Sequence, residues 1–413
     1  MKTNNRFLLV FILGLLSAIG PFSIDMYLPG FPQIAADLNT TVANVSLSLS
    51  SFFIGISAGQ LLYGPLLDRF GRKRPLYAGL TVYIVTSLGC ALAASADHLI
   101  ILRFLQALGS CAGMVASRAM VRDLFPATET AKVFSQLMLV IGVSPIIAPT
   151  AGGYLTAAFG WHSVFVVLTI MVALILLAVH FYLPESKVPD PNFSLKPAPI
   201  LKNYVAVLKE PQFITYAFTG ALASAALYAY IAGSPYVCMQ LFKASEKLYG
   251  WIFAIIASGL ILCSQVNSFL LRNKKSEQII KVALIFQTLT GIALFTASAM
   301  GWLNLFGTVA LIFIFLCCQG FIFPNSSALS LAPFSKNAGS ASALLGTIQM
   351  SIGALSSAMV SFLSNNTALP MTGVMATCAA SSFTVLMIGN TIIRYKAKPE
   401  DVKEETAEMV STL

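Results

Sequence analysis

Three charged side chains stand inside apolar runs that are long enough to cross a membrane, where an unpaired charge is costly. Asp25 lies in the stretch SAIGPFSIDMYLPGFP, residues 17–32, and is the one carboxylate that we place in the hydrocarbon region. Arg103 and Arg118 share a later run and stand about 22 Å apart along a helix. A carboxylate in a low-dielectric cavity near a cation can bind and release a proton. Asp25 is therefore a candidate proton-coupling residue, and Arg103 is expected to lie at a similar depth and partly neutralise it.

Each of these residues also has a structural interpretation. Asp25 can cap a helix end or lie at a wet interface, because Pro29 and Pro32 end the helix soon after it. Arg103 can tie two helices together without any part in proton transfer. Arg118 lies about one turn from the next polar loop, so it can either snorkel to water or line a central cavity.

The composition that surrounds these residues is that of a polytopic membrane protein. The 413 residues are 57% hydrophobic and 10% charged, against about 25% charged residues in soluble domains, and the mean hydropathy is +0.81. An all-α membrane protein with twelve transmembrane helices is predicted. These helices are expected near residues 7–28, 43–66, 76–95, 98–120, 132–156, 162–183, 212–234, 249–271, 279–299, 303–325, 338–364 and 371–394.

A polar stretch rich in Pro and Lys, residues 184–211, divides the twelve segments six and six. We predict an N-terminal six-helix bundle at 1–183, a cytoplasmic linker at 184–211 and a C-terminal six-helix bundle at 212–395. The charged tail at 396–413 is predicted to be cytoplasmic and disordered, and residues 200–210 to form a short amphipathic helix. Two such halves usually place a substrate site between them at mid-membrane.

Lysine and arginine are distributed very unevenly between the two sets of loops. Of the 25 basic residues, 21 fall on the side of the termini and the linker, and only Lys243 and Lys247 fall on the opposite side. The positive-inside rule then places both termini and the linker in the cytoplasm. This topology, together with anionic lipid headgroups, accounts for the net charge of +9, so no nucleic-acid partner is expected.

Several motifs resemble those of a known family. The stretch GPLLDRFGRKRPL, residues 64–76, resembles the signature loop of the major facilitator superfamily. Gly64 is also expected to permit close helix approach, and Asp68 to accept from the amides of the next helix. The resemblance implies a fold of two pseudo-symmetric six-helix halves. It also implies a cytoplasmic latch that breaks during alternating access, formed by Gly64, Asp68, Arg69, Gly71 and Arg72.

Two further stretches fit the same family. RFLQALGSCAG, residues 103–113, is similar to its fourth-helix motif, which implies that Arg103, with Gln106 and Gly109, contributes to proton transfer or its regulation. GVSPIIAPTAGGYL, residues 142–155, resembles the fifth-helix motif of drug:proton antiporters, although Ala148 stands where the family usually has glycine. The residues that carry this antiporter motif are Pro145, Pro149, Gly152 and Gly153.

The stretches SIDMYLPGFPQIA, SRAMVRDLFP and GSASALLGTIQMSIGA resemble the Bcr/CflA subfamily of bacterial drug-resistance transporters. This resemblance implies that Asp25, within DMYLP, is the protonatable residue. Aromatic and polar side chains in the spans, together with Arg118, are candidates to line an adaptable, largely apolar substrate cavity, and lipid-facing or interhelical packing is the alternative for each. These candidates are Tyr27, Tyr228, Tyr230, Trp251, Gln319 and Gln349.

We therefore predict proton-coupled efflux of small amphipathic drugs or metabolites across the bacterial cytoplasmic membrane. No cofactor is expected, since the proton gradient supplies the energy, and the transporter is expected to be a monomer in the bilayer. A proton-coupled importer of a nutrient with the same fold is the alternative, and the Ala148 departure is its best support. An enzyme is not expected, because GISAG at 55–59 lies inside a helix and the embedded residues include no paired carboxylates. No metal site is expected either, because the three histidines form no cluster and the seven cysteines no CxxC pair.

Overall fold

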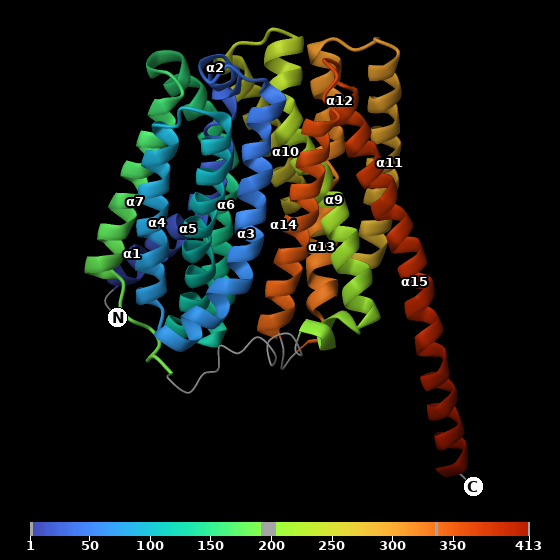
Figure 1. Cartoon of the computed structure of the whole chain (residues 1–413). Coiled ribbons are helices and arrows are strands. Elements are labelled where there is room, and N and C mark those ends of the chain that lie inside the picture. Colours follow the sequence, from blue (N-terminus) through green and yellow to red (C-terminus); the bar gives the residue numbers. More distant parts are fainter. Residues whose placement is uncertain (1–2, 191–203, 335–337, 412–413) are drawn as a thin grey trace.

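The computed structural model describes residues 3–190, 204–334 and 338–411, and each regular element within these ranges is a helix. Two groups of helices stand side by side, one before and one after the linker (Figure 1). The end of the bundle that carries the linker is termed the linker end. The opposite end carries the short helix α2 (Phe31–Asp37) and is termed the α2 end.

The first group consists of α1 (Thr3–Asp25), the short 3-10 helix η1 (Leu28–Gly30), α2, α3 (Val42–Phe70), α4 (Lys73–Ala91), α5 (Ala96–Leu124), α6 (Ala127–Phe159) and α7 (His162–Tyr182). The second consists of α9 (Pro211–Pro235), the π-helix η2 (Tyr236–Leu241), α10 (Glu246–Leu270), α11 (Ser276–Ala299), α12 (Leu305–Cys317), α13 (Gln319–Leu331), α14 (Ala338–Phe362) and α15 (Leu369–Ser411). These groups are termed the N-half and the C-half.

Polar residues set the starts of four helices at the α2 end. The side chains of Thr41, Ser95, Ser245 and Asn304 accept hydrogen bonds from backbone amides in the first turns of α3, α5, α10 and α12. Such caps satisfy amides that have no partner within the helix. At the linker end, α3 stops at Gly71, whose φ of 82° lies in the left-handed region that glycine adopts without strain.

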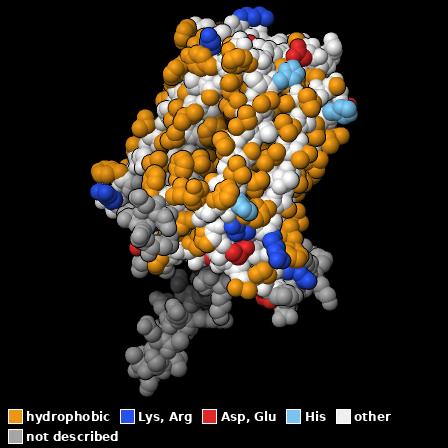
Figure 2. Space-filling view, turned by 90° about the vertical axis from the view of Figure 1, so that its left-hand side faces the viewer, with side chains coloured by type: hydrophobic (Ala, Val, Ile, Leu, Met, Phe, Trp, Pro, Cys, Tyr) orange, Lys and Arg blue, Asp and Glu red, His pale blue; other side chains and the backbone are white. Residues whose placement is uncertain are grey.

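Eleven of the described helical segments are long and apolar enough to cross a membrane. The remaining predicted span, 76–95, corresponds to α4, which has 19 residues, begins with Lys73 and Arg74, and packs against α5 and α7. Figure 2 shows one outer face of the molecule, where apolar side chains cover the middle and charged ones gather toward the two ends. The predicted all-α architecture of twelve spans is therefore confirmed.

The structure corrects two details of the prediction and confirms part of a third. The tail is not disordered, since α15 continues as a helix through Ser411. Its Lys, Glu and Ala residues favour helix, and the preceding span supplies the nucleus. The tenth span is two helices, α12 and α13, that meet at Cys318. In the linker, residues 204–208 are helical, with Val207 buried against α9 and α14, whereas residues 200–203 lie outside the described ranges.

The two halves meet along two pairs of helices. In one pair, α3 packs against α14, and in the other α6 packs against α10. Within the N-half α3 and α4 pack against α5, and within the C-half α9 packs against α14 and α15. The turn after α1 contacts α6, α9 and α10, so the segment next to Asp25 lies where the halves join.

Candidate functional site

Asp25 is the last residue of α1, and it is buried, with 5% of its surface exposed. The carboxylate forms no hydrogen bond or ion pair with any residue in the described ranges. Tyr228, Tyr230 and Tyr249, all from the C-half, lie within electrostatic range of it. Asp25 thus neither caps a helix nor lies at a wet surface, but faces the opposite half of the molecule.

Arg103 is fully buried on α5 and is held by groups of the N-half alone. One guanidinium nitrogen donates to Gln106 Oε1 at 2.6 Å, and the other donates to the carbonyl oxygen of Ser23 at 2.8 Å. The rings of Tyr27 and Phe52 lie 4.2 and 4.1 Å from the guanidinium carbon. Cation–π contacts of this kind contribute about 2 kcal/mol each when they are desolvated.

The predicted pairing of Arg103 with Asp25 is wrong in this structure, although both lie at a similar depth. The guanidinium is committed to the Ser23 carbonyl and the two rings, while the carboxylate faces the C-half. Tyr27 is also corrected, because its ring is buried against Arg103 and its hydroxyl bonds to Ser48 at 3.1 Å. Tyr27 therefore belongs to the N-half core and does not line a cavity in this state.

Arg118 lies nearer the linker end of α5 and has a different environment. The guanidinium lies deep among the atoms of the bundle, and its flanking residues Ser117 and Ala119 are buried, yet the Arg118 side chain is exposed. We infer from these observations that the side chain projects into an internal cavity that solvent reaches. This favours the cavity-lining alternative over snorkelling. No described residue forms a hydrogen bond or ion pair with Arg118.

The remaining cavity candidates fall into two groups. Tyr230, Gln319 and Gln349 are buried, and each has a side-chain polar atom without a partner among the described residues. Tyr228 is partly buried, and its ring lies 4.6 Å from that of Phe53 across the two halves. These four remain candidates for substrate contact.

Trp251 is 53% exposed and belongs to a stripe of exposed apolar side chains along α10. Leu248, Ile255, Leu262 and Val266 continue this stripe at helical spacing. Such a face is turned toward lipid, so the prediction that Trp251 lines the cavity is corrected. The sequence places Trp251 within a span but does not indicate whether its side chain faces the cavity or the lipid.

A row of serine pairs, termed the serine ladder, joins α3 to α14 across the halves. Ser50 donates to Ser357 at 2.8 Å, Ser57 and Ser351 are 2.8 Å apart, and Ser46 bonds to Ser361. One step further toward the linker end, the Gln60 amide lies directly against Gly346, and a Cβ there would require this side chain to move. The ladder closes one side of the junction from the α2 end down to this contact.

Glycines of the predicted antiporter motif close the other side, where α6 meets α10. A Cβ added to Gly153 would lie 2.6 Å from the carbonyl oxygen of Glu246, and one added to Gly250 would lie 2.8 Å from that of Pro149. A Cβ on Gly152 would strike the carbonyl oxygen of Met26, the residue after Asp25. Two adjacent glycines thus bring α6 against the C-half and against the Asp25 segment.

Pro145 and Pro149 both lie inside α6, where each removes a backbone donor. The helix still continues through both residues to Phe159.

A shallow vestibule of about 560 Å³ remains outside the closed junction at the α2 end, lined from both halves by residues that include Thr41, Tyr236 and Ser364. The halves therefore touch at the α2 end.

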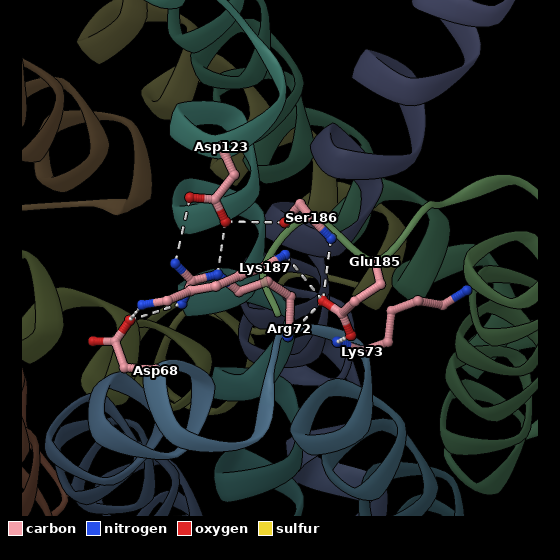
Figure 3. Close-up of polar contacts among 7 residues, drawn as sticks. All are labelled: Asp68, Arg72, Lys73, Asp123, Glu185, Ser186 and Lys187. Carbon is pink, nitrogen blue, oxygen red and sulfur yellow. Dashed lines mark hydrogen bonds and ion pairs between the residues drawn. The ribbon is translucent and has the colours of Figure 1, made fainter. Parts of the chain in front are cut away.

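A charged network at the linker end surrounds Arg72 (Figure 3). Arg72 Nε donates to Asp123 at 2.7 Å, and its Nη1 donates to Asp68 at 3.1 Å. Burial alone would lower the pKa of Arg72, but the hydrogen bonds and charges of Asp123 and Asp68 raise it above its ordinary value. The predicted latch residues Asp68 and Arg72 are thus brought together, within the N-half.

The first residues of the linker are fastened to this network (Figure 3). The Glu185 carboxylate accepts from the backbone amides of Arg72 and Lys73 at 2.8 and 3.0 Å. Ser186 donates to Asp123 at 2.9 Å, and Lys187 Nζ donates to Asp68 at 2.6 Å. Lys187 of the linker thus pairs with Asp68, the carboxylate that the family resemblance assigns to the latch.

Three other predicted latch residues have different environments. Gly71 lies against Glu185, and a Cβ there would be 3.1 Å from its carboxylate. The Arg69 carbonyl accepts from the amide of Asp190 at 3.1 Å. Gly64 has open space where a Cβ would be, so the predicted close helix approach at Gly64 is absent in this state.

The fold and these contacts define a multi-pass transporter architecture, and comparisons with known proteins identify the family. The sequence profile of the Major Facilitator Superfamily matches residues 11–358, so the chain belongs to this family of transporters, which are not enzymes. A mutant form of the nucleoside transporter NupG superposes with a TM-score of 0.73 at 15% identity, covering 94% of this chain and 99% of that one. An inward-facing, occupied bacterial homologue of the lysosomal transporter Spinster gives 0.70 at 14% identity, with 96% and 98% covered.

Three relatives are similar in sequence over most of their length. The uncharacterized MFS-type transporter YdgK of Bacillus subtilis is 34% identical, with 90% of this chain and 92% of YdgK covered. The bicyclomycin resistance protein homolog of Haemophilus influenzae is 30% identical, with 92% and 96% covered. The multidrug resistance protein MdtL of Escherichia coli O157:H7 is 32% identical, with 80% and 82% covered. The resemblance to drug-resistance transporters that the motifs indicated is thus confirmed.

Two sets of residues in these contacts are not predicted from the sequence. The linker residues Glu185, Ser186 and Lys187 lie in a connecting segment, and their one signal is charge close to a basic loop. The serine ladder left a clearer signal, because the stretch SLSLSSFFIGIS at 46–57 concentrates hydroxyl groups in a span. The matching serines of α14 are Ser351, Ser357 and Ser361.

Proposed function

We propose that the protein is a proton-coupled exporter of small amphipathic drugs or metabolites in the bacterial cytoplasmic membrane. Two relatives carry printed names that refer to multidrug and bicyclomycin resistance, and both align over most of this chain. The antiporter-type helix α6 supports export, since its glycines lie in the junction between the halves.

The distribution of basic residues supports a cytoplasmic linker end with both termini on that side. The closed α2 end is then extracytoplasmic, and the cavity at Arg118 is reached from the cytoplasm. In this orientation the described state is inward-facing. Substrate enters from the cytoplasm or the inner leaflet, and the halves then rock to expose it to the outside.

The burial of Asp25 at the junction is the observation that carries the proposal. A carboxylate that is enclosed without an ion-pair partner is costly when charged, so its protonation depends on whether the halves are closed around it. When the α2 end opens, a proton from outside reaches Asp25, and the halves then close around the neutral carboxyl, which is less costly to bury than the charged one. Substrate that enters the inward-facing cavity then displaces this proton to the cytoplasm. Drug and proton binding are then thermodynamically linked through the two states, and inward proton movement supplies the energy without any cofactor.

The side chains around this path have distinct roles in the proposal. Arg103 fixes the backbone before Asp25 through the Ser23 carbonyl, which makes it a positioning residue. Tyr230, Gln319 and Gln349 offer polar atoms without partners to a bound substrate, and Tyr228 offers an aromatic ring. The transporter acts as a monomer, because each half completes the cavity of the other.

The test uses purified wild-type protein and Asp25→Asn reconstituted separately in liposomes that carry a pH-sensitive dye. An inward proton gradient is imposed, and candidate drugs are added while internal pH is followed. We expect drug-evoked proton movement with wild type and none with Asp25→Asn. Asp97→Asn is the matched control, because Asp97 is an exposed carboxylate at the α2 end, and it should behave as wild type.

Equal proton movement in wild type and Asp25→Asn would remove Asp25 from the coupling role. Drug flux that requires no proton gradient in either protein would overturn the coupling itself. Drug movement in the same direction as the protons would instead establish the importer alternative. Binding of labelled drug to Asp25→Asn in detergent checks that the variant remains folded.

A further inference from the structure

The charged residues within the spans of the N-half do not balance. Asp25 is the one carboxylate in the spans, whereas Arg103 and Arg118 are both arginines without a carboxylate partner among the described residues. The embedded charge is therefore positive when Asp25 is ionised, and more positive when it is protonated. A cavity lined by charge of one sign attracts a counter-charge, and a ligand can supply it.

Arg103 cannot take this ligand, because its guanidinium is enclosed by rings and bonded within the N-half. Arg118 can, because its side chain projects into the internal cavity with its donors free. The nearest acidic residues along the chain are already engaged. Asp123 accepts from Arg72 and Ser186, and Glu129 pairs with Arg6 at 2.5 Å.

Arg122 lies one helical turn beyond Arg118, is exposed, and likewise has no partner among the described residues. Its charge adds to the positive field on this side of α5. An arginine guanidinium binds a carboxylate or phosphate through two parallel hydrogen bonds, and it also binds strong carbonyl acceptors. The wall of the cavity therefore presents a preformed site for a negatively charged or carbonyl-rich group.

We propose that Arg118 is the anion-binding residue of the substrate cavity and that the transporter prefers anionic or carbonyl-rich substrates over lipophilic cations. This inference rests on the proposed transport function and narrows its substrate class. Arg118 and Arg103 are about 22 Å apart along α5, and Asp25 lies at the depth of Arg103. A small ligand on Arg118 therefore does not touch Asp25, so substrate and proton influence each other through the conformation of the bundle.

The test compares two probes of equal ring size and opposite charge, 2-naphthoate and 2-naphthylmethylammonium. Equilibrium binding of each radiolabelled probe is measured with the full-length protein in nanodiscs of phosphatidylcholine, which contributes no net charge. We expect wild type to bind naphthoate at least about tenfold more tightly than the ammonium probe, since hydrogen bonds to a charged group contribute about 1.5–3 kcal/mol. Arg118→Gln should abolish this preference, and Arg118→Lys should retain part of it.

Arg74→Gln is the matched control, because Arg74 is exposed at the linker end outside the cavity, and it should leave the preference unchanged. Thermal melting of each variant verifies that it is folded. Equal binding of the two probes by wild type, or an unchanged preference in folded Arg118→Gln, would overturn the proposal. The assay needs no proton gradient, so its failure is distinguishable from a failure of the Asp25 coupling test.

Discussion

The serine ladder provides a test of how the α2 end of the junction is held closed. We consider the triple variant Ser46→Ala, Ser50→Ala and Ser57→Ala, which removes the α3 side of all three pairs. Interhelical hydrogen bonds in membranes contribute about 0.6 kcal/mol each, so the loss is about 1.8 kcal/mol. The partner serines are not all left without bonds, since Ser361 also donates to the carbonyl oxygen of Ser357 at 3.2 Å. The closed state should therefore lose about a factor of 20 relative to the open one.

The measurement is a distance distribution between spin labels at the α2 end, one in each half. Ala36 and Ser364 are suitable sites, because both are exposed and line the vestibule there. In wild type without a gradient we expect one short distance. In the triple variant we expect a second, longer distance that represents a substantial fraction of the molecules, because the cost of opening is reduced.

A control triple variant replaces Ser258, Ser268 and Ser330, whose hydroxyls bond only to their own helices. It has the same number of substitutions and should retain the wild-type distribution. If the ladder variant is folded and its distribution matches that of wild type, the hydroxyl pairs do not hold the junction, and packing of α6 on α10 must account for the closure. A longer distance in the control variant as well would show a nonspecific effect of serine loss.

Three further outcomes follow from single contacts. Gly152→Ala should lower the melting temperature and abolish transport, because its methyl group strikes the Met26 carbonyl, whereas Gly20→Ala, with open space around it, should melt as wild type. Glu185→Gln should raise the rate of limited trypsin cleavage in the linker by about tenfold, because charge-assisted bonds to two backbone amides are lost; an unchanged rate would show that the linker is not fastened there. Trp251→Ala should leave transport rates in liposomes within a factor of two of wild type, because that side chain faces outward, and a large loss would return it to the cavity.

The sequence was sufficient for the features that depend on composition and local pattern. The twelve spans and the place of Asp25 inside the first of them follow from hydropathy and charge, because the bilayer imposes strong constraints on both. The latch motif also predicted the meeting of Asp68 and Arg72, since they are one helical turn apart in the chain. These predictions required no knowledge of which helices are neighbours.

The predictions that failed depend on neighbours that are distant in the chain. Tyr27 and Trp251 both lie in apolar spans, but the first is enclosed by Phe52 and Arg103, and the second faces outward. A span gives no strong amphipathic signal when lipid and protein core are both apolar. The pairing of Asp25 with Arg103 failed for a related reason, because aromatic rings and a carbonyl satisfied the arginine instead.

The contacts of Gly152 and Gly153 explain how protonation of Asp25 can be linked to opening of the α2 end. Gly153 touches the first turn of α10, while its neighbour Gly152 touches the backbone of Met26, one residue after Asp25. A movement of α10 away from α6 releases the first contact and frees α6 to shift against the second. In the proposed cycle the separation of the halves therefore reaches the Asp25 segment through one peptide unit. A proton on Asp25 favours the closed contacts in return, because the buried carboxyl is less costly when it is neutral and the linkage between two sites is reciprocal.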